Sequence, residues 1–181
     1  MSAPVKFVVN FVVIMLIQLF LLNDIVIKSS VSLLGIPAFI PLIYPLILLL
    51  MPVNTPSWAT MAIGFFTGLV MDFYCNTPGM HAAASVLLGF IRPSLLSLFF
   101  QQTTKELKSV VPSLFKMGIT SFLIYISASI LAHHLFFYIL QIWSLKNIPF
   151  ILFKTLLSSI LSVILILLSQ LLFAQRDTRR G

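Results

Sequence analysis

The sequence predicts an all-α, polytopic membrane protein: one bundle of about six transmembrane helices without a soluble domain. Two observations carry this prediction. Of the 181 residues, 60% are hydrophobic and only 8% are charged, whereas a soluble domain carries roughly 25% charged residues. The chain also contains long stretches without any charge, and one crossing of the hydrocarbon takes roughly 20 apolar residues.

The uncharged stretches divide the chain into six expected spans. No charge lies between Lys6 and Asp24, and the stretch from Lys28 to Asp72 has room for two crossings. The expected spans are residues 7–23, 32–51, 59–75, 82–100, 113–138 and 151–173. The first span has the short basic start of a signal peptide, but no small-residue cleavage site follows it. We therefore expect it to remain as a helix.

The second expected span contains Pro37, Pro41 and Pro45. Their spacing of four residues places them on one face of a helix, and each proline removes a backbone donor. We therefore expect this span to be kinked or partly unwound. In lipid such a segment must face protein or a wet cavity.

The basic residues set the expected orientation. With both termini in the cytoplasm, the inner side holds Lys6, Lys105, Lys108, Lys116, Arg176, Arg179 and Arg180, and the outer side holds Lys28, Lys146 and Lys154. This excess satisfies the positive-inside rule. The same residues form no basic stripe interleaved with aromatics, so no nucleic-acid partner is expected.

Two stripes of small and polar residues occupy the third and fourth spans. They are Thr60, Gly64, Gly68, Asp72 and Asn76 on the third span, and Ala82, Ser85, Gly89 and Arg92 on the fourth. Each stripe lies on one face of its helix. Small residues let helix backbones approach closely in lipid. We expect the stripes to face each other across the short loop between the spans, as packing within the chain and not as a mark of dimerisation.

Asp72 and Arg92 are the charges with the least access to water, and an ionisable residue inside the membrane is a candidate functional site. A direct or water-bridged pair between them is one interpretation. The other is that Arg92 extends inward and Asp72 outward, each unpaired. Pro93 frees the carbonyl of Gly89, which is a further candidate partner for the guanidinium.

The histidines do not predict a metal site. Cys75, His81, His133 and His134 all fall toward the outer side of the membrane. A metal site needs three or four convergent ligands, and adjacent histidines on a helix diverge by about 100°. We expect these histidines to meet water or lipid headgroups at the interface, and we expect neither a metal nor a cofactor.

The motifs of enzymes are missing from the sequence. It contains no GxSxG, no HExxH, no glycine-rich phosphate loop and no CxxC. Of the four acidic residues, only Asp72 is expected to be sheltered from water, so chemistry by paired carboxylates is excluded. The sequence therefore predicts that the chain is not an enzyme, and an acid–base pair in a wet cavity would reopen that question.

Residues 53–93 resemble MreD, the membrane subunit of the bacterial rod-shape system. The family pattern is a glycine-bearing helix that ends in G-L-x-x-D, followed by T-P-x-G-x-H-A. The matching residues are Gly68, Leu69, Asp72, Thr77, Pro78, Met80, His81 and Ala82. The spacing departs slightly, because Gly79 precedes Met80. Outside this segment the resemblance rests on length and topology.

The resemblance implies a non-enzymatic scaffold in the bacterial cytoplasmic membrane. Such proteins act with MreC, and through it with MreB and the enzymes of lateral cell-wall elongation. Their fold is similar to that of the substrate-binding subunits of energy-coupling-factor vitamin transporters, so a small-molecule-binding subunit is the alternative function. Membrane lipid is the other expected partner. The candidate residues for packing and partner contact are Gly64, Gly68, Asp72, His81, Gly89 and Arg92.

Overall fold

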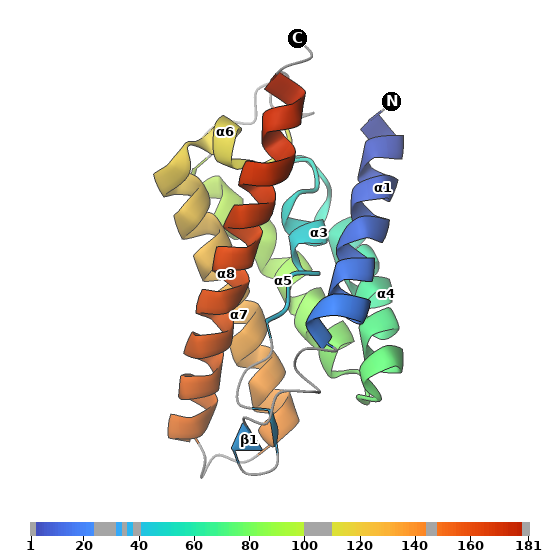
Figure 1. The fold of residues 1–181 in the computed structure, drawn as a ribbon, viewed down its shortest axis with the longest axis vertical. Coiled ribbons are helices and arrows are strands. Elements are labelled where there is room, and N and C mark those ends of the chain that lie inside the picture. The colour runs from blue at the N-terminus through green and yellow to red at the C-terminus, as the bar shows by residue number, and fades with distance from the viewer. Residues whose placement is uncertain are drawn as a thin grey trace.

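The structure is a computed structural model that describes residues 3–23, 32–33, 36–37, 41–99, 110–143 and 148–178, with side chains over 9–23, 41–99, 110–143 and 148–171. It is predominantly helical (Figure 1). Its elements are α1 (Ala3–Leu16), the π-helix η1 (Ile17–Leu22), α3 (Leu46–Leu49), α4 (Ser57–Cys75), α5 (Met80–Ser97), α6 (Leu114–Met117), α7 (Ile119–Ile142) and α8 (Ile148–Thr178), with the two-residue strands β1 (Ser32–Leu33) and β2 (Ile36–Pro37).

Within the described residues, four helices are long and apolar enough to cross a membrane: α4, α5, α7 and, over Ile148–Leu171, α8. The apolar helix Val9–Leu22 is shorter. The predicted helical architecture is thus confirmed, and the length and composition of these helices are consistent with a membrane protein. The count of six spans is not confirmed.

The second expected span, residues 32–51, is not one continuous helix. Strands β1 and β2 pair antiparallel within it, residues 41–43 have no regular structure, and among the residues of this span that the structure describes only the four of α3 are helical. The prediction of partial unwinding is confirmed at Pro41 and Pro45. Proline lacks the N–H that a helix needs, so each one stops a helix from extending backward along the chain.

The fifth expected span, residues 113–138, divides into two helices. Gly118 has a φ of 78°, which lies outside the helical region and ends α6 before α7 begins. Glycine adopts this conformation without the steric cost that a Cβ adds. The main helix therefore begins at Ile119 and continues to Ile142.

Two helical hairpins form the body of the protein. Helix α4 packs along α5, α7 packs along α8, and α5 contacts α7. Helix α3 lies among α1, α4 and α5, and its Leu48 and Leu49 side chains are almost completely buried. Helix α1 begins and α8 ends at the same end of the bundle (Figure 1).

The core is built around the irregular segment that contains α3, residues 41–52, which we call the central segment.

Candidate functional site

The central segment, residues 41–52, places irregular backbone inside the bundle. Its residues from Pro41 to Leu49 are all buried. A buried backbone group without a hydrogen-bond partner costs roughly 1–3 kcal/mol, and non-helical backbone at membrane depth occurs only where protein or water satisfies it. Side chains from four surrounding elements supply those partners here.

Gln18 provides the largest share. Its Oε1 accepts hydrogen bonds from the backbone N–H of Ile43 at 2.7 Å and of Tyr44 at 3.4 Å. Its Nε2 donates to the carbonyl of Pro41 at 3.3 Å and to Asn23 Oδ1 at 3.0 Å. Gln18 lies in the π-helix η1 and is completely buried. The amide of Gln18 thus binds two backbone N–H groups and one backbone carbonyl of the central segment.

Helices α8, α7 and α5 hold the rest of the segment. Ser162 Oγ accepts from the N–H of Leu42 at 2.9 Å, and the Tyr125 hydroxyl donates to the carbonyl of Leu49 at 3.2 Å. The guanidinium Nη2 of Arg92 donates to the carbonyl of Met51 and, at 3.3 Å, to that of Pro52. These polar side chains satisfy the backbone where the second expected span is not helical.

Arg92 neither pairs with Asp72 nor extends to water. It is completely buried and binds the carbonyls of Met51 and Pro52, not that of Gly89. Asp72 binds the first turn of α5 at Ala82, and Arg92 lies ten residues further along that helix, about 15 Å at 1.5 Å per residue. Both interpretations of this pair are therefore corrected. The Nε and Nη1 of Arg92 have no hydrogen-bond partner within the described residues.

Asp72 closes the start of α5. Its Oδ1 accepts from the N–H of His81 at 3.0 Å and from the Thr77 hydroxyl at 2.6 Å, and its Oδ2 accepts from the N–H of Ala82 at 2.9 Å. Free N–H groups at a helix N-terminus favour a negative charge. The carboxylate also lies 5% exposed. Its position is thus explained by capping a neighbouring helix.

The small residues of α4 and α5 bring the two backbones into contact. A Cβ added to Gly68 would lie 2.4 Å from the Cα of Ala82, and one added to Gly64 would lie 2.7 Å from the carbonyl oxygen of Ser85. A Cβ on Gly89 would lie 2.9 Å from the backbone N of Met61. The prediction that the two stripes face each other is confirmed.

The Tyr44 hydroxyl lies at the centre of a second polar cluster. It is 2.9 Å from His133 Nε2 and 3.2 Å from His81 Nδ1, and it accepts from the Ser85 hydroxyl at 3.3 Å. Because a hydroxyl has one proton, it donates to one of these imidazoles and accepts from the other. The cluster joins the central segment to α5 and α7.

The histidines are buried inside the protein and do not meet water or lipid headgroups, which corrects that expectation. His81, His133 and His134 are at most 2% exposed. His134 Nδ1 contacts the carbonyl of Ile130 at 2.9 Å, so Nδ1 donates and Nε2 is left to accept from Ser162 Oγ at 3.3 Å. His81 packs against Phe137 with ring centroids 4.4 Å apart. Within the described residues, no group of three His, Cys, Asp or Glu side chains is arranged to hold a metal.

Sequence reasoning missed most of this polar core. Gln18, Tyr44, Tyr125 and Ser162 were not among the candidates, although a single buried amide or hydroxyl in an apolar span is itself a signal. Lys154 enters the sequence argument only through its place on the outer side of the membrane, and the structure shows that its side chain is buried. The sequence signal for the residues that bind this backbone was the proline-rich second span. Its prolines interrupt the helix, and the backbone groups that this frees require hydrogen-bond partners.

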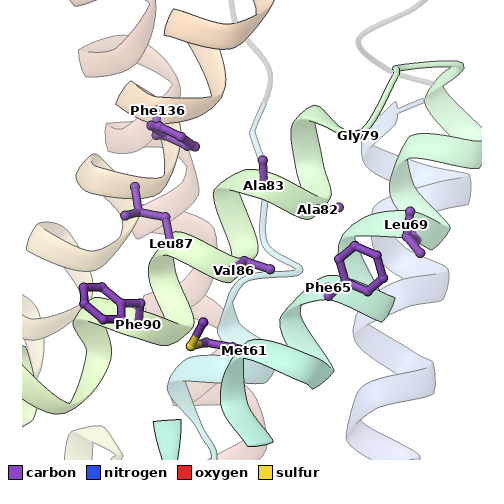
Figure 2. Close-up of a pocket in the computed structure, with 10 residues that line it drawn as sticks. All are labelled: Met61, Phe65, Leu69, Gly79, Ala82, Ala83, Val86, Leu87, Phe90 and Phe136. Atoms are coloured by element: carbon purple, nitrogen blue, oxygen red, sulfur yellow. The ribbon is translucent and has the colours of Figure 1, made fainter. Parts of the chain in front are cut away.

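An open groove of about 540 Å³ lies on the outer face of the α4–α5 hairpin (Figure 2). All its lining residues are apolar or glycine, and they come from α4, α5, the turn before α5, and α7: Met61, Phe65, Leu69, Gly79, Ala82, Ala83, Val86, Leu87, Phe90 and Phe136. Small-molecule sites usually add a few convergent polar groups to such a lining. This groove therefore suits an apolar helix or an acyl chain better than a polar ligand.

Comparisons with known proteins found no matching family model, no similar curated protein and no similar solved structure.

Proposed function

We propose that the chain is a membrane scaffold of the MreD type in the bacterial cytoplasmic membrane, acting with MreC and through it with MreB and the enzymes of cell-wall elongation. The observation that supports the proposal most is the close packing of α4 against α5 within the segment that resembles MreD. Asp72 accepts hydrogen bonds from the N–H groups of His81 and Ala82, and Gly68 lies against the backbone of Ala82. The motif thereby supports a rigid surface for a partner. It performs no turnover.

The partner surface in this proposal is the apolar groove on that hairpin. Ala82, Ala83 and Gly79 contribute small residues to its lining beside the larger side chains of Phe65 and Phe90 (Figure 2). Small residues allow a second helix to approach closely, and packing of this kind drives helix association in lipid. A membrane helix of MreC is the proposed occupant, with lipid chains filling the groove in its absence.

Copurification tests the proposal directly. The tagged chain is extracted from its host in mild detergent, and MreC is expected in the eluate. Ala83→Trp fills the groove from a half-buried position and is expected to reduce recovery of MreC at least tenfold. Ala132→Trp is the matched control, because Ala132 is a half-buried alanine on α7 that does not line the groove. Failure to recover MreC, or equal loss in both variants, would contradict the proposal.

The orientation belongs to the same proposal. Both termini are placed in the cytoplasm, and the start of α1 and the end of α8 lie at one end of the bundle (Figure 1). Reporter fusions at the two termini are expected to report the cytoplasm in both cases. A periplasmic signal from either fusion would overturn this orientation and exchange the inner and outer sides.

A small-molecule-binding subunit of a vitamin-type transporter is the second candidate. It is favoured by the broken segment 41–52, because discontinuous helices often line ligand sites in transporters. The same copurification separates the two candidates. Recovery of an ATPase pair with a coupling membrane subunit, without MreC, would favour the transporter.

A further inference from the structure

The hydrogen bonds around the Tyr44 hydroxyl use all of its capacity. The hydroxyl lies 2.9 Å from His133 Nε2 and 3.2 Å from His81 Nδ1, and the Ser85 hydroxyl donates to it at 3.3 Å. A tyrosine hydroxyl has one proton to donate and can accept at its oxygen. Its proton goes to one imidazole, and its oxygen accepts from the other imidazole and from Ser85. The cluster is therefore complete when each of the two histidines is neutral.

His133 has no place for a second proton in this cluster. If its Nε2 accepts from Tyr44, the added proton lies on Nε2 and meets the proton of the hydroxyl. If its Nε2 donates to Tyr44 instead, the added proton lies on Nδ1, which is buried and has no hydrogen-bond partner within the described residues. The His133 side chain is also completely buried. Either arrangement therefore accommodates His133 only as a neutral imidazole.

The charged and titratable groups around the cluster do not compensate for a charge on His133. The ring of His134 lies 5.6 Å away between centroids, and a charge there would repel one on His133. Asp72 on α4 is the only carboxylate among the described side chains, and both of its oxygens already bind the loop and first turn of α5. The other titratable side chains near the cluster are two that are uncharged near neutral pH and one amine: Cys75 on α4, Tyr138 on α7 and Lys154 on α8.

The cluster lies near one end of the bundle. His81 is the second residue of α5, and side chains on a helix lean toward its N-terminus. The loop before α5 has exposed residues at Asn76 and Pro78. Water can therefore reach the two imidazoles once Tyr44 moves away from them.

We propose that His133 is a proton sensor that controls the attachment of the central segment to α5 and α7. While His133 is neutral, it holds Tyr44, which belongs to the central segment. In the open state Tyr44 leaves, and His133 meets water, where a histidine takes up a proton near pH 6.5. The closed state does not bind that proton, so acid favours the open state, by about tenfold for each pH unit below 6.5. This device does not depend on the scaffold proposal.

Hydrogen exchange of the purified chain in a maltoside detergent, measured by mass spectrometry, tests the sensor. Rates at pH 7.5 and 5.5, corrected for the intrinsic pH dependence of amide exchange, give the opening equilibrium of each segment. For residues 41–49 the wild-type equilibrium is expected to shift toward opening at least about tenfold at pH 5.5. Residues 64–74 on α4 are the internal reference and are expected to shift by less than about twofold. A shift well below tenfold in residues 41–49, or an equal shift in both segments, would overturn the proposal.

Variants assign the response to His133. His133→Gln keeps an amide that can bind the Tyr44 hydroxyl but takes up no proton, so it is expected to reduce the pH response about tenfold. His81→Gln is the matched control, because it removes the other histidine on the same hydroxyl and is expected to keep a response of at least about tenfold. Lys154→Met is expected to respond as wild type.

An undiminished response in His133→Gln would overturn the proposal, and so would a response lost only in His81→Gln. The comparison of the two segments in the wild type decides the question if His133→Gln does not fold.

Discussion

The α4–α5 hairpin and the central segment 41–52 are both buried, but they satisfy their backbone in opposite ways. The hairpin is regular, and its cap joins Asp72 to Ala82, ten residues away. The central segment is irregular, and its partners are distant: Gln18 is 25 residues from Ile43, and Ser162 is 120 residues from Leu42. The hairpin is stabilised by close packing between two helices that are adjacent in the sequence. The central segment is stabilised by individual hydrogen bonds from helices that are distant in the sequence.

This difference predicts which substitutions each region tolerates. In the hairpin, added volume is harmful because two backbones are already in contact. In the central segment, loss of a polar atom is harmful because a buried backbone group loses its partner. The four predictions below test these statements, beginning with the largest expected effect.

Gly68→Ala is expected to lower the free energy of unfolding by about 3 kcal/mol. The new Cβ would lie 2.4 Å from the Cα of Ala82, so the helices must separate, because no flexible side chain can move away. Unfolding in mixed SDS micelles, followed by circular dichroism, measures the change. Gly79→Ala is the control: its Cβ meets nothing within 4 Å, and its φ of 81° costs only about 1–2 kcal/mol. A larger effect at Gly79 would contradict the close packing.

Gln18→Leu is expected to cost about 2–3 kcal/mol, because the N–H of Ile43 and the carbonyl of Pro41 lose a buried partner. The same unfolding assay applies. Asn10→Leu is the matched control, since Asn10 is an amide on α1 with an exposed side chain, and it is expected to leave stability unchanged or slightly higher. Equal effects would mean that Gln18 does not hold the central segment.

The same contrast explains what could be predicted from the sequence. The facing of the α4 and α5 stripes followed from helical periodicity, because Gly64 and Gly68 on α4, and Ser85 and Gly89 on α5, are each four residues apart. The unwinding near Pro41 and Pro45 followed from the missing proline N–H. Both are local properties, so a single sequence records them.

The partners of the central segment could not be predicted in this way. The prolines indicate that carbonyls and N–H groups are free, but no periodicity indicates that Gln18, Tyr125 and Ser162 supply their hydrogen bonds. The expectation that the histidines meet water or lipid headgroups fails for the same reason, since Tyr44 contacts His81 and His133 from outside their own helices. The role of Asp72 as a cap was also missed, because its sequence position suggested only a sheltered charge.

Asp72→Asn is expected to cost about 1–2 kcal/mol, the usual range for a lost helix cap. Asparagine keeps one side-chain oxygen, so it can still accept from the start of α5 but cannot keep all three hydrogen bonds. Thr77→Val removes a single hydroxyl donor to that carboxylate and is expected to cost less, about 0.5–1 kcal/mol. If Thr77→Val costs more than Asp72→Asn, the carboxylate is not the centre of this cap.

The smallest expected effect is the coupling between Asp72 and Arg92. Asp72 holds the first turn of α5, and Arg92 holds the carbonyls of Met51 and Pro52, so they share no partner. Independent sites have additive effects within about 0.5 kcal/mol. The unfolding free energies of Asp72→Asn, Arg92→Met and the double variant should therefore give a coupling energy below that limit.

A coupling energy well above 0.5 kcal/mol would show that Asp72 and Arg92 interact, as the sequence suggested. It would also show that the hairpin and the central segment are not independent. The control is a pair that does share a partner: Thr77→Val combined with Asp72→Asn should couple, because the Thr77 hydroxyl donates to the Asp72 carboxylate. Additivity in the first pair with coupling in the second would mean that the two charges of the resembling segment serve different structures: one the hairpin, and the other the central segment.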